Sequence, residues 1–171
     1  MATAVTETPV QAVVQGPARK RWTRSECAVI EDAGLFDQER VELIDGELIS
    51  KLGKKRPHVD TGTRLFAWLL RVFGDDNVNS EAPINVAAED NPTNEPVPDL
   101  IVLKPSYSGL SAPPQPNDLH LVVEVADSSL TFDLTVKAAL YARAGIVEYW
   151  VLDVSDSATR MDGWLENGFG Q

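Results

Sequence analysis

The chain has 171 residues, of which 43% are hydrophobic and 24% are charged, which is typical of one globular domain with a real core. Its 15 Lys and Arg against 26 Asp and Glu give a net charge of −11, which counts against binding of nucleic acid through overall charge. One cysteine excludes an internal disulfide, and no apolar run approaches the roughly 18 residues needed to span a bilayer. We therefore expect a cytoplasmic protein without a membrane partner.

The N-terminal segment, residues 1–20, is small and polar and predicts a flexible arm. It lacks the basic region followed by an apolar block that marks a secretory signal. Residues 21–171 then form the single expected domain. Its first helix begins at Thr23, because Thr23 and Glu26 match a capping box, and Gly34 marks its end.

A β-hairpin is predicted over residues 40–49, where two apolar runs flank an Asp-Gly dipeptide typical of hairpin turns. A short basic loop, residues 51–56, follows it. A second helix is expected from Pro57 to Gly74. Its apolar residues at helical spacing are Val59, Phe66, Leu69, Leu70 and Phe73.

The rest of the chain combines apolar strands with loops and one helix. Strands are expected at 84–87, 99–103, 120–125 and 148–153, with a weaker one at 158–165, loops at 89–98 and 104–118, and a helix at about 133–144. The strand–helix–strand unit over 119–153 is typical of a parallel crossover. Apolar strands flanked by helices predict an α/β fold with a mixed sheet covered on both faces.

Two of these strands carry a single carboxylate in an otherwise apolar run. Asp99 follows Pro98 at a strand start, and Glu124 lies between two valines. Burying an unpaired carboxylate is costly, so such residues are usually paired, metal-bound or at a rim. If the strands are neighbours, both acids could enter one cleft and hold Mg²⁺ together with waters and a substrate phosphate. The pattern alone leaves open that Asp99 caps a turn and Glu124 faces solvent.

Three further features could belong to a site. Lys137 shares a helical face with Asp133 and Tyr141, which fits either a surface Asp–Lys pair or a cation aimed at the sheet. His58, at a helix start, could be a general base, a metal ligand, a phosphate contact or a structural residue. The basic loop 51–56 could meet phosphates or remain a solvated loop.

Other site chemistries lack their motifs. The chain has no glycine-rich phosphate loop, no dinucleotide fingerprint and no nucleophile elbow. One cysteine and two histidines are too few for a typical structural zinc site.

Several segments together resemble the Uma-two (Uma2) family, described as candidate restriction endonucleases within the PD-(D/E)xK nuclease superfamily. They are VELIDGEL (41–48), PDLIVL (98–103), LVVEVADSSL (121–130), DLTVKAALYARAGIVEYWVLD (133–153) and a helix led by His58. They follow the family's order. The resemblance implies a restriction-endonuclease-like αβββαβ core, preceded here by a helix and a β-hairpin.

The resemblance gives the two lone carboxylates a metal-binding role. Pro98 and Asp99 correspond to the PD of the motif and Glu124 to its (D/E). The resemblance therefore implies that Asp99 and Glu124 hold Mg²⁺ or Mn²⁺, the ions that suit oxygen ligands.

The lysine departs from the usual superfamily pattern. It normally lies two residues after the acid, where this chain has Ala126. The resemblance implies that the role has moved to Lys137, since the tip of a long side chain can reach one point from two backbones. Glu47 and His58 also match family positions. His58 fits the site better, because the superfamily often adds a polar residue from its first core helix.

The resemblance implies a metal-dependent endonuclease acting on DNA, in which Asp99, Glu124, Lys137 and His58 are the candidate catalytic residues. The alternative is a catalytically silent relative that serves as a binding or assembly module, which the acidic charge and the displaced lysine favour. A hydrolase of small nucleotides, which needs a closed pocket, is a third option. The chain ends sooner after its last core strand than family members do, so we expect either a truncated chain or an edge strand that pairs in a homodimer.

Overall fold

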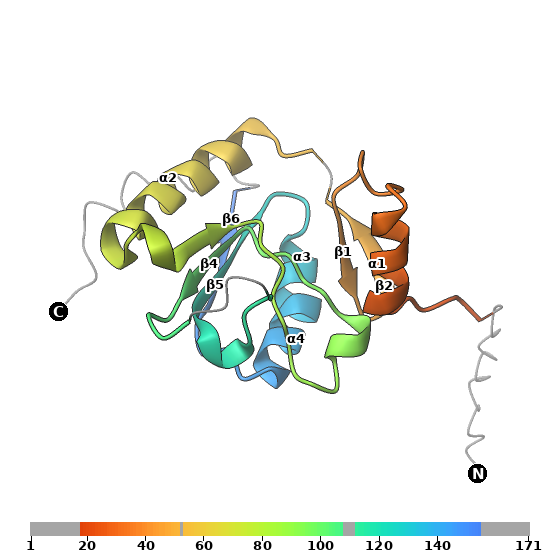
Figure 1. Ribbon diagram of the computed structural model, residues 1–171. Helices are drawn as coiled ribbons and strands as arrows, with labels where there is room; N and C mark the ends of the chain where they lie inside the picture. Colours follow the sequence, from red (N-terminus) through yellow and green to blue (C-terminus); the bar gives the residue numbers. More distant parts are fainter. Residues whose placement is uncertain (1–17, 52, 108–111, 155–171) are drawn as a thin grey trace, which may run out of the picture.

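The computed structural model describes residues 18–51, 53–107 and 112–154. Its helices and strands, drawn in Figure 1, are α1 (Arg24–Asp32), β1 (Val41–Ile44), β2 (Glu47–Ser50), α2 (Arg56–Phe73), β3 (Val78–Ser80), β4 (Leu100–Leu103), β5 (Leu119–Ala126), α3 (Leu130–Phe132), α4 (Ala138–Arg143) and β6 (Tyr149–Asp153). A π-helical turn, Asp133–Lys137, joins α3 to α4. The predicted fold class is confirmed: α2, β3, β4, β5, the α3–α4 helical segment and β6 follow the order αβββαβ, and α1 and the β1–β2 hairpin precede them.

The main sheet has four strands in the order β3-β4-β5-β6. β4 is antiparallel to both of its neighbours, and β6 is parallel to β5. A parallel neighbour needs a crossover connection, and the α3–α4 segment supplies it as predicted.

Helices cover both faces of this sheet (Figure 1). On one face, α2 packs against a cluster that includes Leu65, Leu69, Leu100, Val102, Leu121 and Val123. On the other face, α4 packs against a cluster that includes Ile101, Leu103, Leu119, Val122, Leu140 and Tyr141. Because both sides of β4 and β5 are buried, these strands read as continuous apolar runs rather than alternating ones.

Local signals in the N-terminal part are confirmed. Thr23 caps α1 in a capping box with Glu26. The hairpin turns at Asp45 and Gly46, both at positive φ (47° and 74°), as a type I′ turn requires. α2 ends at Phe73, and Gly74, also at positive φ, caps it by donating its N–H to Leu70 O.

The strand predicted at 84–87 is wrong, because the third strand of the fold lies at β3 instead. Ile84 and Val86 are buried, as their apolar character suggested. Their backbone groups, however, bond to loops: Ile84 N donates to Pro96 O (3.1 Å) and Val86 N to Asn91 Oδ1 (2.8 Å). A proline-rich neighbour lacks the N–H groups that a strand ladder needs, so the segment is buried without being a strand.

Two helices differ in detail from the prediction. In α2, Val59 is 43% exposed, and Leu65 takes its place in the core. The helix predicted at about 133–144 begins at Leu130 rather than Asp133, since α3 and the π turn precede α4. The predicted strand at 158–165 and residues 1–17 of the predicted arm lie outside the described residues. In the described part of the chain, no helix is both long and apolar enough to cross a membrane.

Candidate active site

The two lone carboxylates face each other across neighbouring strands. Leu100 of β4 pairs with Val123 of β5 in antiparallel register, and continuing this register by one residue places Asp99 opposite Glu124. Both are buried, at 6% and 3% exposed. The N–H of Val125 donates to Asp99 Oδ2 at 2.8 Å. Like charges directly opposite each other destabilise a sheet, so this pair requires cations nearby.

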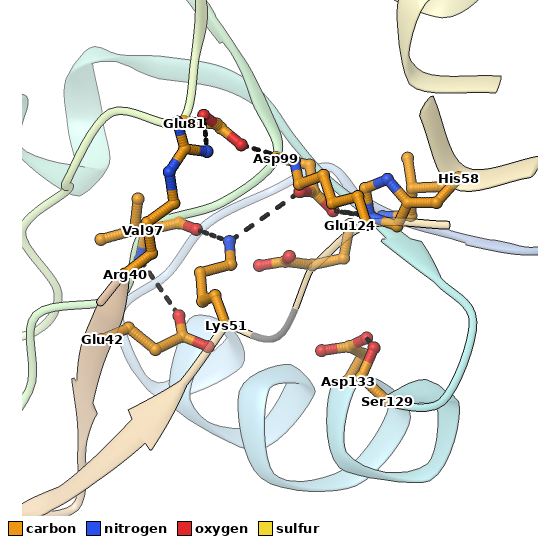
Figure 2. Close-up of polar contacts among 12 residues, drawn as sticks. Arg40, Glu42, Lys51, His58, Glu81, Val97, Asp99, Glu124, Ser129 and Asp133 are labelled. Atoms are coloured by element: carbon orange, nitrogen blue, oxygen red, sulfur yellow. Dashed lines mark hydrogen bonds and ion pairs between the residues drawn. The ribbon is translucent and has the colours of Figure 1, made fainter. Parts of the chain in front are cut away.

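Basic side chains surround Asp99 (Figure 2). Lys54 Nζ lies 2.8 Å from Asp99 Oδ1, Lys51 Nζ lies 3.8 Å from it, and His58 Nε2 lies 3.3 Å from Asp99 Oδ2. Burial alone raises the pKa of Asp99, but the His58 contact, the charge of Lys51 and the hydrogen bonds from Lys54 and Val125 outweigh it. The pKa of Asp99 is therefore held well below its usual range, and the group is ionised at neutral pH.

Glu124 has a different environment from Asp99. Its Oε1 accepts from Lys137 Nζ at 2.9 Å and from the Tyr141 hydroxyl at 3.1 Å. Burial raises the pKa of Glu124 to about 7, against the charges of Lys137 and Lys51 and with the help of the negative Glu42 and Asp99. Two neighbouring carboxylates with opposite pKa shifts are typical of sites where acids share chemistry.

Lys137 holds a group of buried acids together. Its side chain is 2% exposed, and its ammonium lies 2.9 Å from both Glu42 Oε1 and Glu124 Oε1 and 3.9 Å from Asp133 Oδ1. Burial by itself lowers the pKa of Lys137, but the two glutamates outweigh it, so the pKa is raised. The predicted face of Asp133, Lys137 and Tyr141 is thus real but fully buried. The alternative of a surface Asp–Lys pair is excluded.

Lys137 ends the π-helical turn that begins at Asp133. Ser129 donates a hydrogen bond to Asp133 Oδ2 at 2.6 Å, which ties this turn to the loop that follows β5 (Figure 2). Single π turns inside helices are frequent at functional sites. No feature of the sequence indicated this turn.

Glu42 was missed in the sequence and lies in the site. It is 5% exposed on β1, and its Oε2 accepts from Val97 N at 3.2 Å while its Oε1 meets Lys137. Glu42 is a lone acid in the apolar run Val41–Ile44, which is the same signal that singled out Asp99 and Glu124. Glu47, the hairpin acid considered instead, is exposed on β2.

The carboxylates open into a cleft of about 380 Å³. It lies between the end of β2, the start of α2, the sheet and the π turn, and its walls include Lys51, Lys54, His58, Asp99, Glu124 and Lys137. The structure thus brings together all four residues singled out in the sequence: Asp99, Glu124, Lys137 and His58. A neighbouring cavity of about 810 Å³ shares Glu42, Lys51, Gly53 and Lys54 with it.

The donor set suits a hard divalent cation. Mg²⁺ binds through one or two carboxylates and keeps several waters, and Asp99 and Glu124 supply two opposed carboxylates beside a cleft with room for water. The described residues contain no group of three or more His, Cys, Asp or Glu arranged around one point. A bound ion would therefore take its remaining ligands from water and substrate.

His58 has one unused polar atom. Among the described residues, its buried Nδ1 has no hydrogen-bond partner.

Glu124→Gln is expected to stabilise the metal-free protein in a pH-dependent way. The folded protein raises the pKa of Glu124 to about 7. The protonated carboxyl therefore contributes its full stabilisation below the pKa of the unfolded chain, and this stabilisation is lost as the pH rises through the pKa of the folded protein. Gln resembles the protonated form at every pH. In EDTA we expect a gain on the order of 2 kcal/mol at pH 8 and little at pH 5, measured by urea unfolding. A gain that does not change with pH would contradict this reading of Glu124.

Comparison with known proteins identifies the family of the chain. The model of the Uma2 family, described as "Putative restriction endonuclease", matches residues 30–161. A search of curated proteins gave no match. The matched range contains both carboxylates, Lys137, His58 and the whole four-stranded sheet.

Proposed function

Because the chain belongs to the Uma2 family, a family of nuclease type, we propose that it is a metal-dependent endonuclease that hydrolyses the phosphodiester bonds of DNA. The observation that carries this proposal is the opposition of Asp99 and Glu124 in one cleft, with a buried lysine on Glu124. A cation held by these carboxylates would polarise the phosphate and lower the pKa of a water molecule.

The residues of the site have separate roles in this proposal. Asp99 and Glu124 hold the ion, and Asp99 is kept ionised for that task by its basic neighbours. His58 orients the Asp99 carboxylate through its contact at 3.3 Å. Lys137 and Tyr141 fix the Glu124 carboxylate by bonding one of its oxygens, Oε1. Positioned ligands of this kind are what a metal site needs in order to bind one geometry.

The distribution of charge supports DNA as the substrate despite the acidic total. Residues 51–73 contain six Lys or Arg and one Asp, a net charge of +5 in a chain of −11. Lys51, Lys54 and Lys55 of this segment line the cleft, and the exposed Arg56 of α2 follows them. A basic segment beside an acidic metal site is the pattern that would draw a phosphate backbone to the carboxylates.

The second candidate is a catalytically silent module. It is favoured by the cations that already satisfy Asp99 and by Ala126 at the usual lysine position. Such a protein would still bind through the basic segment, but it would not cut.

Cleavage of supercoiled plasmid and of single-stranded DNA separates the two candidates. We expect wild-type protein to nick DNA in Mg²⁺ or Mn²⁺ and to lose this activity completely in EDTA, since the carboxylates alone supply no electrophile. Calorimetry with Mn²⁺ would measure metal binding independently. If no DNA is cut with any metal and no metal binds, the nuclease proposal fails and the silent module takes its place.

A further inference from the structure

Four lysines line the cleft: Lys51, Lys54, Lys55 and Lys137. Three of them are already held by carboxylates at hydrogen-bond distance. Lys54 lies 2.6 Å from Glu81 and 2.8 Å from Asp99, Lys55 lies 2.8 Å from Asp127, and Lys137 lies 2.9 Å from two glutamates. A lysine held in this way must loosen or share a carboxylate contact before its ammonium can bond directly to another anion.

Lys51 differs from the other three. Its ammonium donates to a neutral group, the carbonyl of Val97, at 2.5 Å, and Asp99 is 3.8 Å away. Among the described residues, the contact with Asp99 is the shortest that the Lys51 ammonium makes with a carboxylate. Figure 2 shows its side chain reaching between Val97 and Asp99. Lys51 is therefore the cleft lysine whose charge is least neutralised by direct contact.

The backbone of Lys51 is anchored, and its side chain reaches the cleft. Its backbone N–H donates to Arg40 O at 2.7 Å, which anchors it at the end of the hairpin. Its side chain is 17% exposed and lines both cavities. The side chain of Lys137, by contrast, is 2% exposed, and its ammonium is enclosed by Glu42 and Glu124. A side chain that touches substrate must reach the cleft, as that of Lys51 does, and cannot be enclosed by acids as that of Lys137 is.

We propose that Lys51, rather than Lys137, is the lysine that contacts the phosphate under attack, and that Lys137 is a positioning residue for Glu124. This inference rests on the proposed function. Lys51 donates a hydrogen bond to a non-bridging oxygen of that phosphate and offsets the negative charge that develops there. It keeps all its protons. The oxygen of one water bonds to phosphorus as the P–O ester bond breaks; one proton of that water ends on the leaving oxygen, and the other stays on the new phosphate group or passes to solvent.

The test compares wild type, Lys51→Met and Lys104→Met. Lys104 donates to Asn117 O at 2.8 Å outside the cleft and serves as the matched control. For Lys51→Met we expect kcat for Mn²⁺-dependent nicking to fall about 100-fold, with Mn²⁺ affinity by calorimetry close to that of wild type. Lys51→Arg should recover part of the loss, because guanidinium also donates to phosphate.

A binding measurement adds a readout that a structural role would not move. With a labelled duplex in Ca²⁺, the slope of log affinity against log salt concentration should fall by about 0.9 for Lys51→Met, which is the loss of one phosphate contact. Nicking by Lys51→Met at the wild-type rate would overturn the inference and leave the nuclease proposal intact. If wild type cuts no DNA, the nuclease proposal fails, and the salt slope alone decides: a reduced slope supports the Lys51 contact and an unchanged slope overturns it.

Discussion

Replacing Lys137 with methionine is expected to lower the free energy of unfolding by about 3–5 kcal/mol. The change removes the ammonium shared by Glu42, Glu124 and Asp133, which are 5%, 3% and 2% exposed. Three buried carboxylates would then lack their cation, and each must be protonated or hydrated at a cost. Methionine fills a similar volume, so the loss reports charge rather than packing.

Urea unfolding at pH 7.5, followed by circular dichroism, measures this loss. Lys104→Met is the control for removing a lysine outside the group, and we expect it to stay within about 0.5 kcal/mol of wild type. The loss for Lys137→Met should shrink at pH 5, because the pKa of Glu124, raised by burial to about 7, lets that carboxyl protonate there. A decrease in the free energy of unfolding below about 1 kcal/mol at pH 7.5 would mean that water, rather than Lys137, stabilises these carboxylates.

Asp99→Asn is expected to reduce metal-dependent DNA cleavage about 1000-fold, which corresponds to about 4 kcal/mol of transition-state stabilisation. The amide keeps the shape of the side chain, and its oxygen can still accept from Val125 N–H, which lies 2.8 Å from Asp99 in the wild type. The negative charge is lost, however, and with it one of the two carboxylates proposed to hold the ion. Mn²⁺ affinity by calorimetry should fall together with the cleavage rate.

Asp76→Asn is the matched control, because Asp76 is an exposed aspartate beyond α2. It should cut DNA at the wild-type rate. Since basic groups hold the pKa of Asp99 below its usual range, the Asn variant should also lose some stability at neutral pH, and this is checked by the same unfolding experiment. Wild-type cleavage by a folded Asp99→Asn protein would remove Asp99 from the proposed site.

Local chemistry made much of the fold predictable. The capping box at Thr23, the Asp-Gly turn and Gly74 each act within a few residues, so their outcome did not depend on the rest of the chain. The apolar runs of β4, β5 and β6 were long enough to be recognised without knowing their partners. The same reasoning failed at 84–87, because hydrophobicity reports burial and not where backbone hydrogen bonds go.

The candidate site was predictable in part. Asp99 and Glu124 were found because a lone acid in a buried strand requires a reason. His58 and Lys137 were noted from their positions on helices, and the family resemblance gave them a role in the site. Glu42 carried the same signal but lies in a hairpin, where an acid is expected at the surface. The basic loop 51–56 was noted as one that could meet phosphates, but its sequence did not distinguish this from a solvated loop and did not single out Lys51 among its cations.

What the sequence by itself determined is therefore most of the elements and their order, with β3 as the exception, and the acids that interrupt apolar strands. Only the tertiary structure decided which charges meet: that β4 and β5 set Asp99 opposite Glu124, that β1 brings Glu42 to Lys137, and that Lys51 reaches the cleft. The physical reason is one of range. Caps and turns act between neighbours along the chain, whereas the energy of a buried charge depends on partners brought together by folding, and that energy separates the enclosed Lys137 from the accessible Lys51.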